Sequence, residues 1–247
     1  QINNIGGSKA NAIDDITPNA YNETWDGLTT GAGTTIANTN NPSFFGSQTS
    51  SGSIDYRMPA YDYMGTTINA SVTYDPNAGE GSPSKGGVGK STQQGKAYTI
   101  QASHETGLEI GGGYETSETG QDSLGSDTSS STHYIKYAMG GLTIAVQEAY
   151  KNARNGATLA DVGDTEATMM GIAYTASDVT VSYGEATMQT KGVGATAARA
   201  EIELTSIQAA YTMGAMTISA AMSETTNHGG VLAQGYEENT LAVSFAF

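Results

Sequence analysis

A chain of 247 residues is long enough for one large β domain or two small ones. Its 25 acidic and 10 basic residues give a net charge of −15, which excludes the basic footprint of a nucleic-acid-binding protein. The absence of cysteine excludes a disulfide scaffold and a thiolate metal site, and no apolar run reaches the roughly 18 residues of a membrane-spanning helix.

Residues 1–50 differ in composition from the rest of the chain. They are rich in Asn, Thr, Gly and Ser and show no sustained hydrophobic period. Acidic residues gather around the only tryptophan, Trp25. Because a loop of this length without elements of its own is normally functional or disordered, we treat 1–50 as one region and 51–247 as a second.

From residue 51 onward, apolar and polar residues alternate, which is the pattern of β-strands. Short breaks and long polar segments separate these strands in strict alternation, so one end of the sheet carries tight turns and the other carries long loops. Outer-membrane barrels have this asymmetry, whereas a Greek-key sandwich has no reason to keep it. The sequence predicts eleven strands, centred on residues 54–58, 68–74, 98–102, 108–114, 133–139, 142–146, 170–174, 179–183, 205–211, 216–222 and 241–247.

The two faces of these strands differ in character. One is aliphatic with an aromatic residue near each end, and the other is built from Thr, Ser, Gln, Asn, Ala and Gly, which suits a water-filled lumen. Aromatic residues at both ends match the interfacial girdles of a membrane barrel, although tyrosine is also common in strands generally. The predicted girdle residues are Tyr137, Tyr174, Tyr211 and Phe247 at the short-turn end, and Tyr74, Tyr98, Tyr114 and Tyr150 at the long-loop end.

Several segments resemble a general diffusion porin of the Gram-negative outer membrane, of the alphaproteobacterial type. They are the C-terminal LAVSFAF, the hairpins YAMGGLTIAV and YTMGAMTISA, and GSIDYRMPAYDYMGTTINASVTYD after a long polar loop. The resemblance implies an all-β transmembrane antiparallel barrel of sixteen strands, a homotrimer, and a third loop that folds into the barrel after strand five. Residues 1–50 would then be the constriction loop, and residues 51–247 the eleven strands that follow it.

On this interpretation the chain is a C-terminal portion that lacks the first five strands. Otherwise part of residues 1–50, such as 34–38, supplies a twelfth strand. The resemblance also implies a bacterial outer-membrane location with lipid and lipopolysaccharide as neighbours. It implies passive passage of small hydrophilic solutes and ions rather than catalysis, with neither a cofactor nor nucleic acid bound.

The constriction of such a channel is expected to carry opposed charges. Loop acids would face bases that alternation turns inward from the strands, and the acidic balance predicts a mild cation preference. Simple exposure of the loop acids is the competing interpretation. The candidate constriction residues are Asp14, Asp15, Glu23, Asp26, Arg57 and Lys136.

Three other functions compete with this one. Residues 85–92 read KGGVGKST, which resembles the phosphate-binding loop of partition-type ATPases, but no apolar strand precedes it and no helix pattern follows. The histidines His104, His133 and His228 have no metal-ligand spacing, and acidic loops such as Asp161–Asp164 are at most weak calcium sites. A barrel that anchors loops without conducting, as an anchor or adhesin, remains the main alternative.

Overall fold

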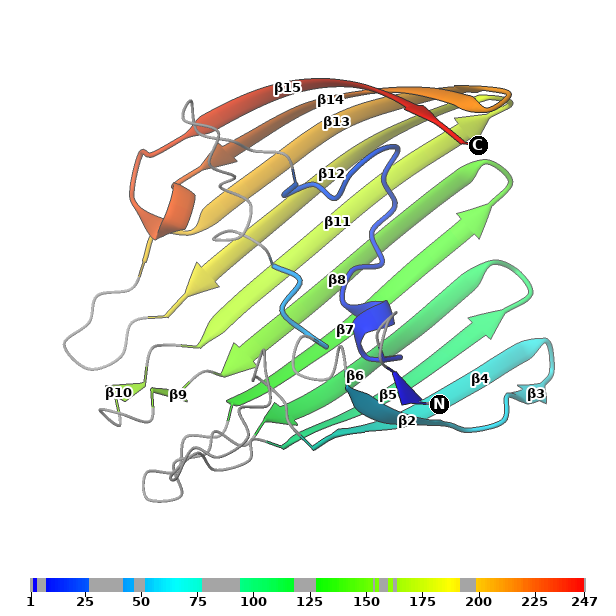
Figure 1. The fold of residues 1–247 in the computed structure, drawn as a ribbon, viewed down its shortest axis with the longest axis vertical. Helices are drawn as coiled ribbons and strands as arrows, with labels where there is room; N and C mark the ends of the chain where they lie inside the picture. Colours follow the sequence, from blue (N-terminus) through cyan, green and yellow to red (C-terminus); the bar gives the residue numbers. More distant parts are fainter. Residues whose placement is uncertain are drawn as a thin grey trace.

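The computed structural model describes residues 2–3, 8–26, 42–46, 52–76, 94–117, 128–152, 154–155, 160–161, 164–191 and 199–246. Nearly every regular element among them is a β-strand of one antiparallel sheet (Figure 1). The strands are β1 Ile2–Asn3, β2 Ser53–Arg57, β3 Tyr61–Tyr63, β4 Thr66–Asp75, β5 Gly95–His104, β6 Leu108–Ser117, β7 Thr128–Met139, β8 Leu142–Asn152, β9 Arg154–Asn155, β10 Ala160–Asp161, β11 Thr165–Ala176, β12 Val179–Thr190, β13 Ile202–Met213, β14 Met216–Thr226 and β15 Tyr236–Phe245. Two 3-10 turns, η1 Asn11–Ile13 and η3 His228–Gly230, interrupt the loops.

Each strand of the large sheet pairs with its neighbours in sequence. The order runs from β1 through β2, β4, β5, β6, β7, β8, β11, β12, β13 and β14 to β15, while β3 pairs with β4 and β9 pairs separately with β10. With β2 and β3 counted as one interrupted strand and the two-residue β1 left out, the described residues contain the eleven predicted strands. Within those residues β1 and β15 form the two sheet edges and do not pair with each other, so the sixteen-strand total stays a prediction.

The first strand is interrupted at Pro59. The pairing register with β4 shifts by one residue between Arg57–Ser71 and Tyr61–Ile68, so an extra residue bulges out there. Proline has no N–H to donate to the ladder, which explains why the bulge falls at this position. The predicted break over 59–65 was therefore too long, since pairing resumes at Tyr61 and the turn itself is only Met64–Gly65.

The connections alternate between tight turns and long segments, as predicted. Turns of two or three residues join β3 to β4, β5 to β6, β7 to β8, β11 to β12 and β13 to β14. Gly140 and Gly214 have φ values of 59° and 61°, which a two-residue hairpin turn requires and which glycine adopts without strain. The longer connections all lie at the opposite end of the sheet, which we call the loop end.

The sheet has two chemically different faces. The inner face, against which residues 8–26 pack, carries hydroxyl pairs such as Ser71–Thr99 at 2.7 Å and Ser206–Ser223 at 2.9 Å between side-chain oxygens. The outer face carries large apolar side chains that are exposed, for example Ile207 at 59 % and Leu241 at 76 % of their full accessibility. Among the described residues, no helix combines the length and the apolar character needed to cross a membrane.

Candidate functional site

Residues 8–26 cross the inner face of the sheet (Figure 1). They are held by inward-pointing polar side chains on three strands, β8 and the neighbouring pair β12 and β13. Gln147 of β8 accepts from Ile16 N at 2.9 Å and donates to the carbonyl oxygens of Ile13 and Asp14 at 2.9 and 3.0 Å. The segment is therefore fixed through its own backbone, which keeps its side chains available for other contacts.

A second glutamine repeats this arrangement on β13. Gln208 accepts from Tyr21 N at 2.9 Å and Asn22 N at 3.1 Å, and it donates to Asn22 O at 2.6 Å. Between the two glutamines, Ser182 of β12 accepts from Ala20 N at 2.9 Å. A continuous path of hydrogen bonds thus carries the segment across the wall from β8 to β13.

Glycines make room for the segment to lie flat on the wall. Gly171 and Gly184 are register partners on β11 and β12. A Cβ at Gly184 would lie 2.0 Å from Thr24 Oγ1, and one at Gly171 would lie 2.9 Å from Pro18 Cδ. Any side chain at either position would push the segment off the sheet.

Two aromatic residues anchor the segment at its ends. Trp25 is buried against Ala167, Met169 and Leu204 on the inner face. Phe45, from residues 42–46, is fully buried with Ala10, Ile13, Ala97 and Tyr134. Burial of an aromatic side chain of this kind contributes roughly 2–3 kcal/mol, so the inner face is partly filled by a structured segment.

The four predicted loop acids all lie on this segment and interact electrostatically. Burial raises the pKa of Asp14 to about 6. Burial, with the negative charges of Asp15, Asp26 and Asp14, raises the pKa of Glu23 to about 7. The pKa values of Asp15 and Asp26 are raised as well, again chiefly by burial. The segment therefore brings four carboxyl groups together, and Glu23, with a pKa of about 7, is only partly ionised near neutral pH.

The two predicted wall bases lie on the inner face, but each is paired with an acid of the wall itself. Arg57 Nε lies 2.7 Å from Asp55 Oδ2, and Asp55 also accepts from Thr73 Oγ1 at 2.8 Å. Lys136 Nζ lies 3.3 Å from Glu109 Oε2. Among the described residues, no ion pair joins either base to the loop acids, so the expected opposition of loop and wall charges is not a direct contact.

Sequence reasoning missed the residues that hold the segment in place. Gln147, Ser182 and Gln208 appeared only as members of a polar strand face. The sequence does contain one indication of their role. A glutamine at an inward strand position among small residues has a long amide side chain, and a buried amide needs hydrogen-bond partners. Its partners lie far away in sequence, for example 131 residues between Ile16 and Gln147, so the sequence pattern could not identify them.

The predicted girdle tyrosines that the structure describes are exposed on the outer face. They are Tyr74, Tyr98, Tyr114, Tyr137, Tyr150, Tyr174 and Tyr211. Phe247 lies outside the described residues.

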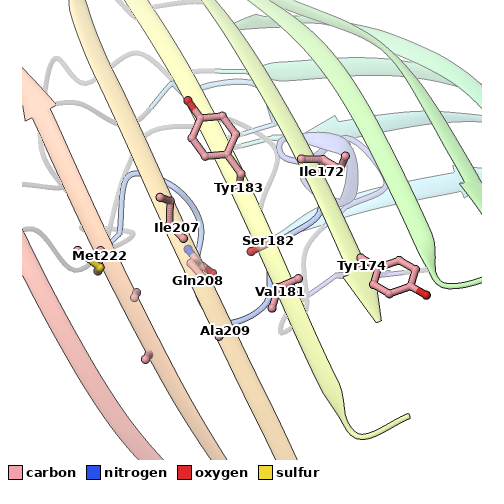
Figure 2. Close-up of a pocket in the computed structure, with 11 residues that line it drawn as sticks. Ile172, Tyr174, Val181, Ser182, Tyr183, Ile207, Gln208, Ala209 and Met222 are labelled. Carbon is pink, nitrogen blue, oxygen red and sulfur yellow. The ribbon is translucent and has the colours of Figure 1, made fainter. Parts of the chain in front are cut away.

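Between the tyrosines the outer face is apolar and hollowed. A hollow of about 480 Å³ lies over β11–β14, and its lining includes Tyr183, Ile207, Ala209, Ala220 and Met222. Figure 2 shows the residues that line it. This hollow opens away from the polar face that carries residues 8–26, so it belongs to the apolar outer face.

The remaining sequence motifs contribute no site in the described residues. Residues 85–92 and residues 34–38 lie outside the described part. His133 is paired with Glu148 on the outer face at 2.9 Å, and His228 packs edge-on against Tyr236. No group of three or more histidine or carboxylate side chains in the described residues is arranged to hold a metal ion.

Comparison with known proteins identifies the family. A family model described as Gram-negative porin matches residues 116–247, more than half of the 247-residue chain. The chain belongs to the Gram-negative porin family. Membership places this porin in the bacterial outer membrane, whereas the alphaproteobacterial type stays a prediction.

Solved structures support the fold. A porin refined at 1.8 Å resolution matches with a TM-score of 0.52 and 17 % identity, over 78 % of this chain and 60 % of its own length. An outer-membrane expressed OmpT of Vibrio cholerae matches with a TM-score of 0.56 and 12 % identity, over 96 % of this chain and 75 % of its own. The chain thus spans less than two thirds of the first of these proteins, and a search of curated protein sequences finds no match.

Proposed function

We propose that this chain forms part of an outer-membrane channel for passive diffusion of small hydrophilic solutes and ions. The observation that carries the proposal is the segment 8–26, fixed across a polar inner face by Gln147 and Gln208 and carrying four acids. Such a segment narrows an aqueous path without closing it and places charge beside the passing solute. Family membership points to a channel rather than an enzyme, and no step of catalysis is needed.

In this proposal residues 1–50 act as the constriction loop, and residues 51–247 form the wall. Asp14, Asp15, Glu23 and Asp26 give the narrow part a negative potential, which favours cations mildly. Arg57 and Lys136 each form an ion pair with an acid of the wall, Asp55 and Glu109, and so they affect that potential without contacting the loop acids. Their role is to limit the negative charge of the wall rather than to bind the loop.

The outer face suits the partners expected in the outer membrane. Its exposed aliphatic band and the hollow over β11–β14 offer packing for the acyl chains of lipid and lipopolysaccharide. A homotrimer is the assembly that the resemblance implies, and it would cover part of the same face. Chemical crosslinking in native membranes, resolved by mass, distinguishes a trimer from a lipid-surrounded monomer.

Liposome swelling tests the channel itself. The full-length protein is reconstituted and challenged with a series of neutral sugars of increasing size. A channel gives uptake that falls with sugar size, whereas a non-conducting anchor or adhesin gives the rate of empty liposomes for every sugar. The second result would contradict the proposal and favour the anchor.

A further inference from the structure

A small pocket lies at the loop end of the inner face, apart from the four acids of the constriction. It has a volume of about 230 Å³. Lys151 of β8 and Arg199, between β12 and β13, both line it, together with the hydroxyl-bearing Thr165 and Thr190. We call these four residues, with Met188, Ile202 and Phe44, the loop-end pocket.

Within the described residues, the two bases of the loop-end pocket have no acidic partner. Arg57, Lys136 and Lys191 form ion pairs with Asp55, Glu109 and Glu166. Lys151 and Arg199, in contrast, form no ion pair with any carboxylate of the described residues. In a chain with 25 acids and 10 bases, two bases that share one pocket without a carboxylate leave a local positive potential that an anion would satisfy.

The backbone around the pocket is fixed, so the positive charge has a defined place. Arg199 N donates to Thr190 O at 3.3 Å, and Ala200 N donates to Gly230 O at 3.1 Å. A Cβ at Gly230 would lie 2.6 Å from Arg199 Cβ, so the absence of a side chain there lets the arginine stem pack closely. Lys151 belongs to the β8 ladder, where it is the register partner of Thr165.

Beside the two bases and the two threonines, the pocket is lined by apolar side chains. Met188 and Ile202 are buried inner-face residues of the Trp25 cluster, and Phe44 packs against the same cluster. An inorganic anion would gain nothing from this floor. A ligand with a charged head and a compact apolar body would use both halves, because its body would displace water from the floor while its head met the bases.

We propose that the loop-end pocket binds small organic carboxylates with an apolar or aromatic body. The carboxylate lies between Lys151 and Arg199, whose guanidinium fork matches its two oxygens, and the body rests on Met188 and Ile202. The inference rests on the proposed channel function, since the pocket would hold such solutes at the mouth before they meet the acidic constriction. It gives an otherwise cation-preferring channel a selective entry site for one class of anion.

Benzoate is a suitable probe, and its binding is measured by isothermal titration and saturation-transfer NMR on the purified full-length protein. We expect a Kd of about 1 mM, as for a fragment of this size. Arg199→Gln and Lys151→Gln should each weaken binding about tenfold, the usual loss for a hydrogen bond to a charged group. Lys191→Gln is the matched control. It removes one positive charge at the same loop end of the sheet, but that charge is already paired with Glu166, so the Kd for benzoate should not change.

Two further ligands test the proposed chemistry. Acetate, which lacks the apolar body, should bind at least about tenfold more weakly than benzoate, and protonated benzylamine should not bind. Equal binding of acetate and benzoate, or equal weakening by Lys191→Gln and Arg199→Gln, would overturn the proposal. Because binding is measured without conduction, a protein that binds benzoate but gives no liposome swelling would contradict only the channel, and a conducting protein that ignores benzoate would contradict only the pocket.

Discussion

Gln147 is the residue on which the position of the inner segment depends most directly. It is fully buried and makes hydrogen bonds to Ile13, Asp14 and Ile16, besides one to Thr132 Oγ1 at 2.8 Å. Glutamine can do this because its amide carries an acceptor oxygen and two N–H hydrogens, one of which is shared between two of the three acceptors around Nε2. An apolar side chain of similar size would fill the space but satisfy none of these groups.

Gln147→Leu should therefore loosen the segment while leaving the sheet intact. Each buried backbone group left without a partner costs about 1–3 kcal/mol, and three are affected. We expect faster limited proteolysis within residues 8–26 and a higher single-channel conductance, with unchanged β content by circular dichroism. Gln189→Leu, the same change at an exposed outer-face position of β12, is the control. Equal proteolysis of the two variants would show that Gln147 does not hold the segment.

Asp14 and Glu23 should make the channel respond to pH. Their pKa values rise from 3.8 and 4.5 to about 6 and about 7, so both bind protons more tightly in the folded chain. The raised pKa values add stability to the folded chain. This stability is fully present below the ordinary pKa values of 3.8 and 4.5, and it is lost as the pH rises through the folded-state values of about 6 and about 7. Lowering the pH from about 8 to about 5 therefore removes negative charge and stabilises the packed segment.

Reversal potentials measured across that pH range should show the cation preference falling with a midpoint between about 6 and about 7. The double variant Asp14→Asn, Glu23→Gln should lose most of this dependence. Glu203→Gln changes the same charge on the outer face and should keep it. A pH profile that is flat in the parent protein, or identical in both variants, would contradict an origin in the segment.

At the scale of elements, the strands were predictable and the contacts of the segment were not. Alternation identified β13 and β14 because a period of two places Ile207 and Met222 on one face whatever lies around them. The bulge at Pro59 was missed because continued pairing of Tyr61 depends on β4, which a local pattern does not contain. The candidate acids were visible as a group around Trp25, but their burial and coupling depend on a wall more than 100 residues away.

The paired glycines of β11 and β12 offer a test of the segment as a packed element. Gly184→Val should displace residues 18–24 because its Cβ would collide with Thr24. The ladder of β12 is unaffected, so we expect altered conductance and faster proteolysis of the segment, with a Tm within a few degrees of the parent. Ala210→Val, on the inner face of β13 near the short turns, is the control. A large drop in Tm with Gly184→Val would indicate that the sheet itself had been disturbed.

For the whole molecule, the proposed cation preference follows from the balance of charge on the inner face. Among the described inner-face residues, the loop-end pocket and residues 8–26, acids outnumber bases by nine to five. The acids are Asp14, Asp15, Glu23, Asp26, Asp55, Asp75, Glu109, Glu115 and Glu238, and the bases are Lys9, Arg57, Lys136, Lys151 and Arg199. Asp55, Asp75 and Glu115 are buried, but the charges that remain in contact with water have a field that depends on the salt around them.

A planar bilayer with a tenfold KCl gradient measures the consequence. We expect a reversal potential of the cation-selective sign at a mean ionic strength of about 0.1 M, where the Debye length is about 10 Å and the field of the segment reaches across a narrow path. At about 1 M the Debye length shrinks to about 3 Å, and the preference should fall by roughly half or more. Neutralising Asp14 and Glu23 should reduce the reversal potential at low salt, much as high salt does in the parent protein. An anion-selective sign, or a preference that salt does not change, would place the selecting charge somewhere other than on residues 8–26.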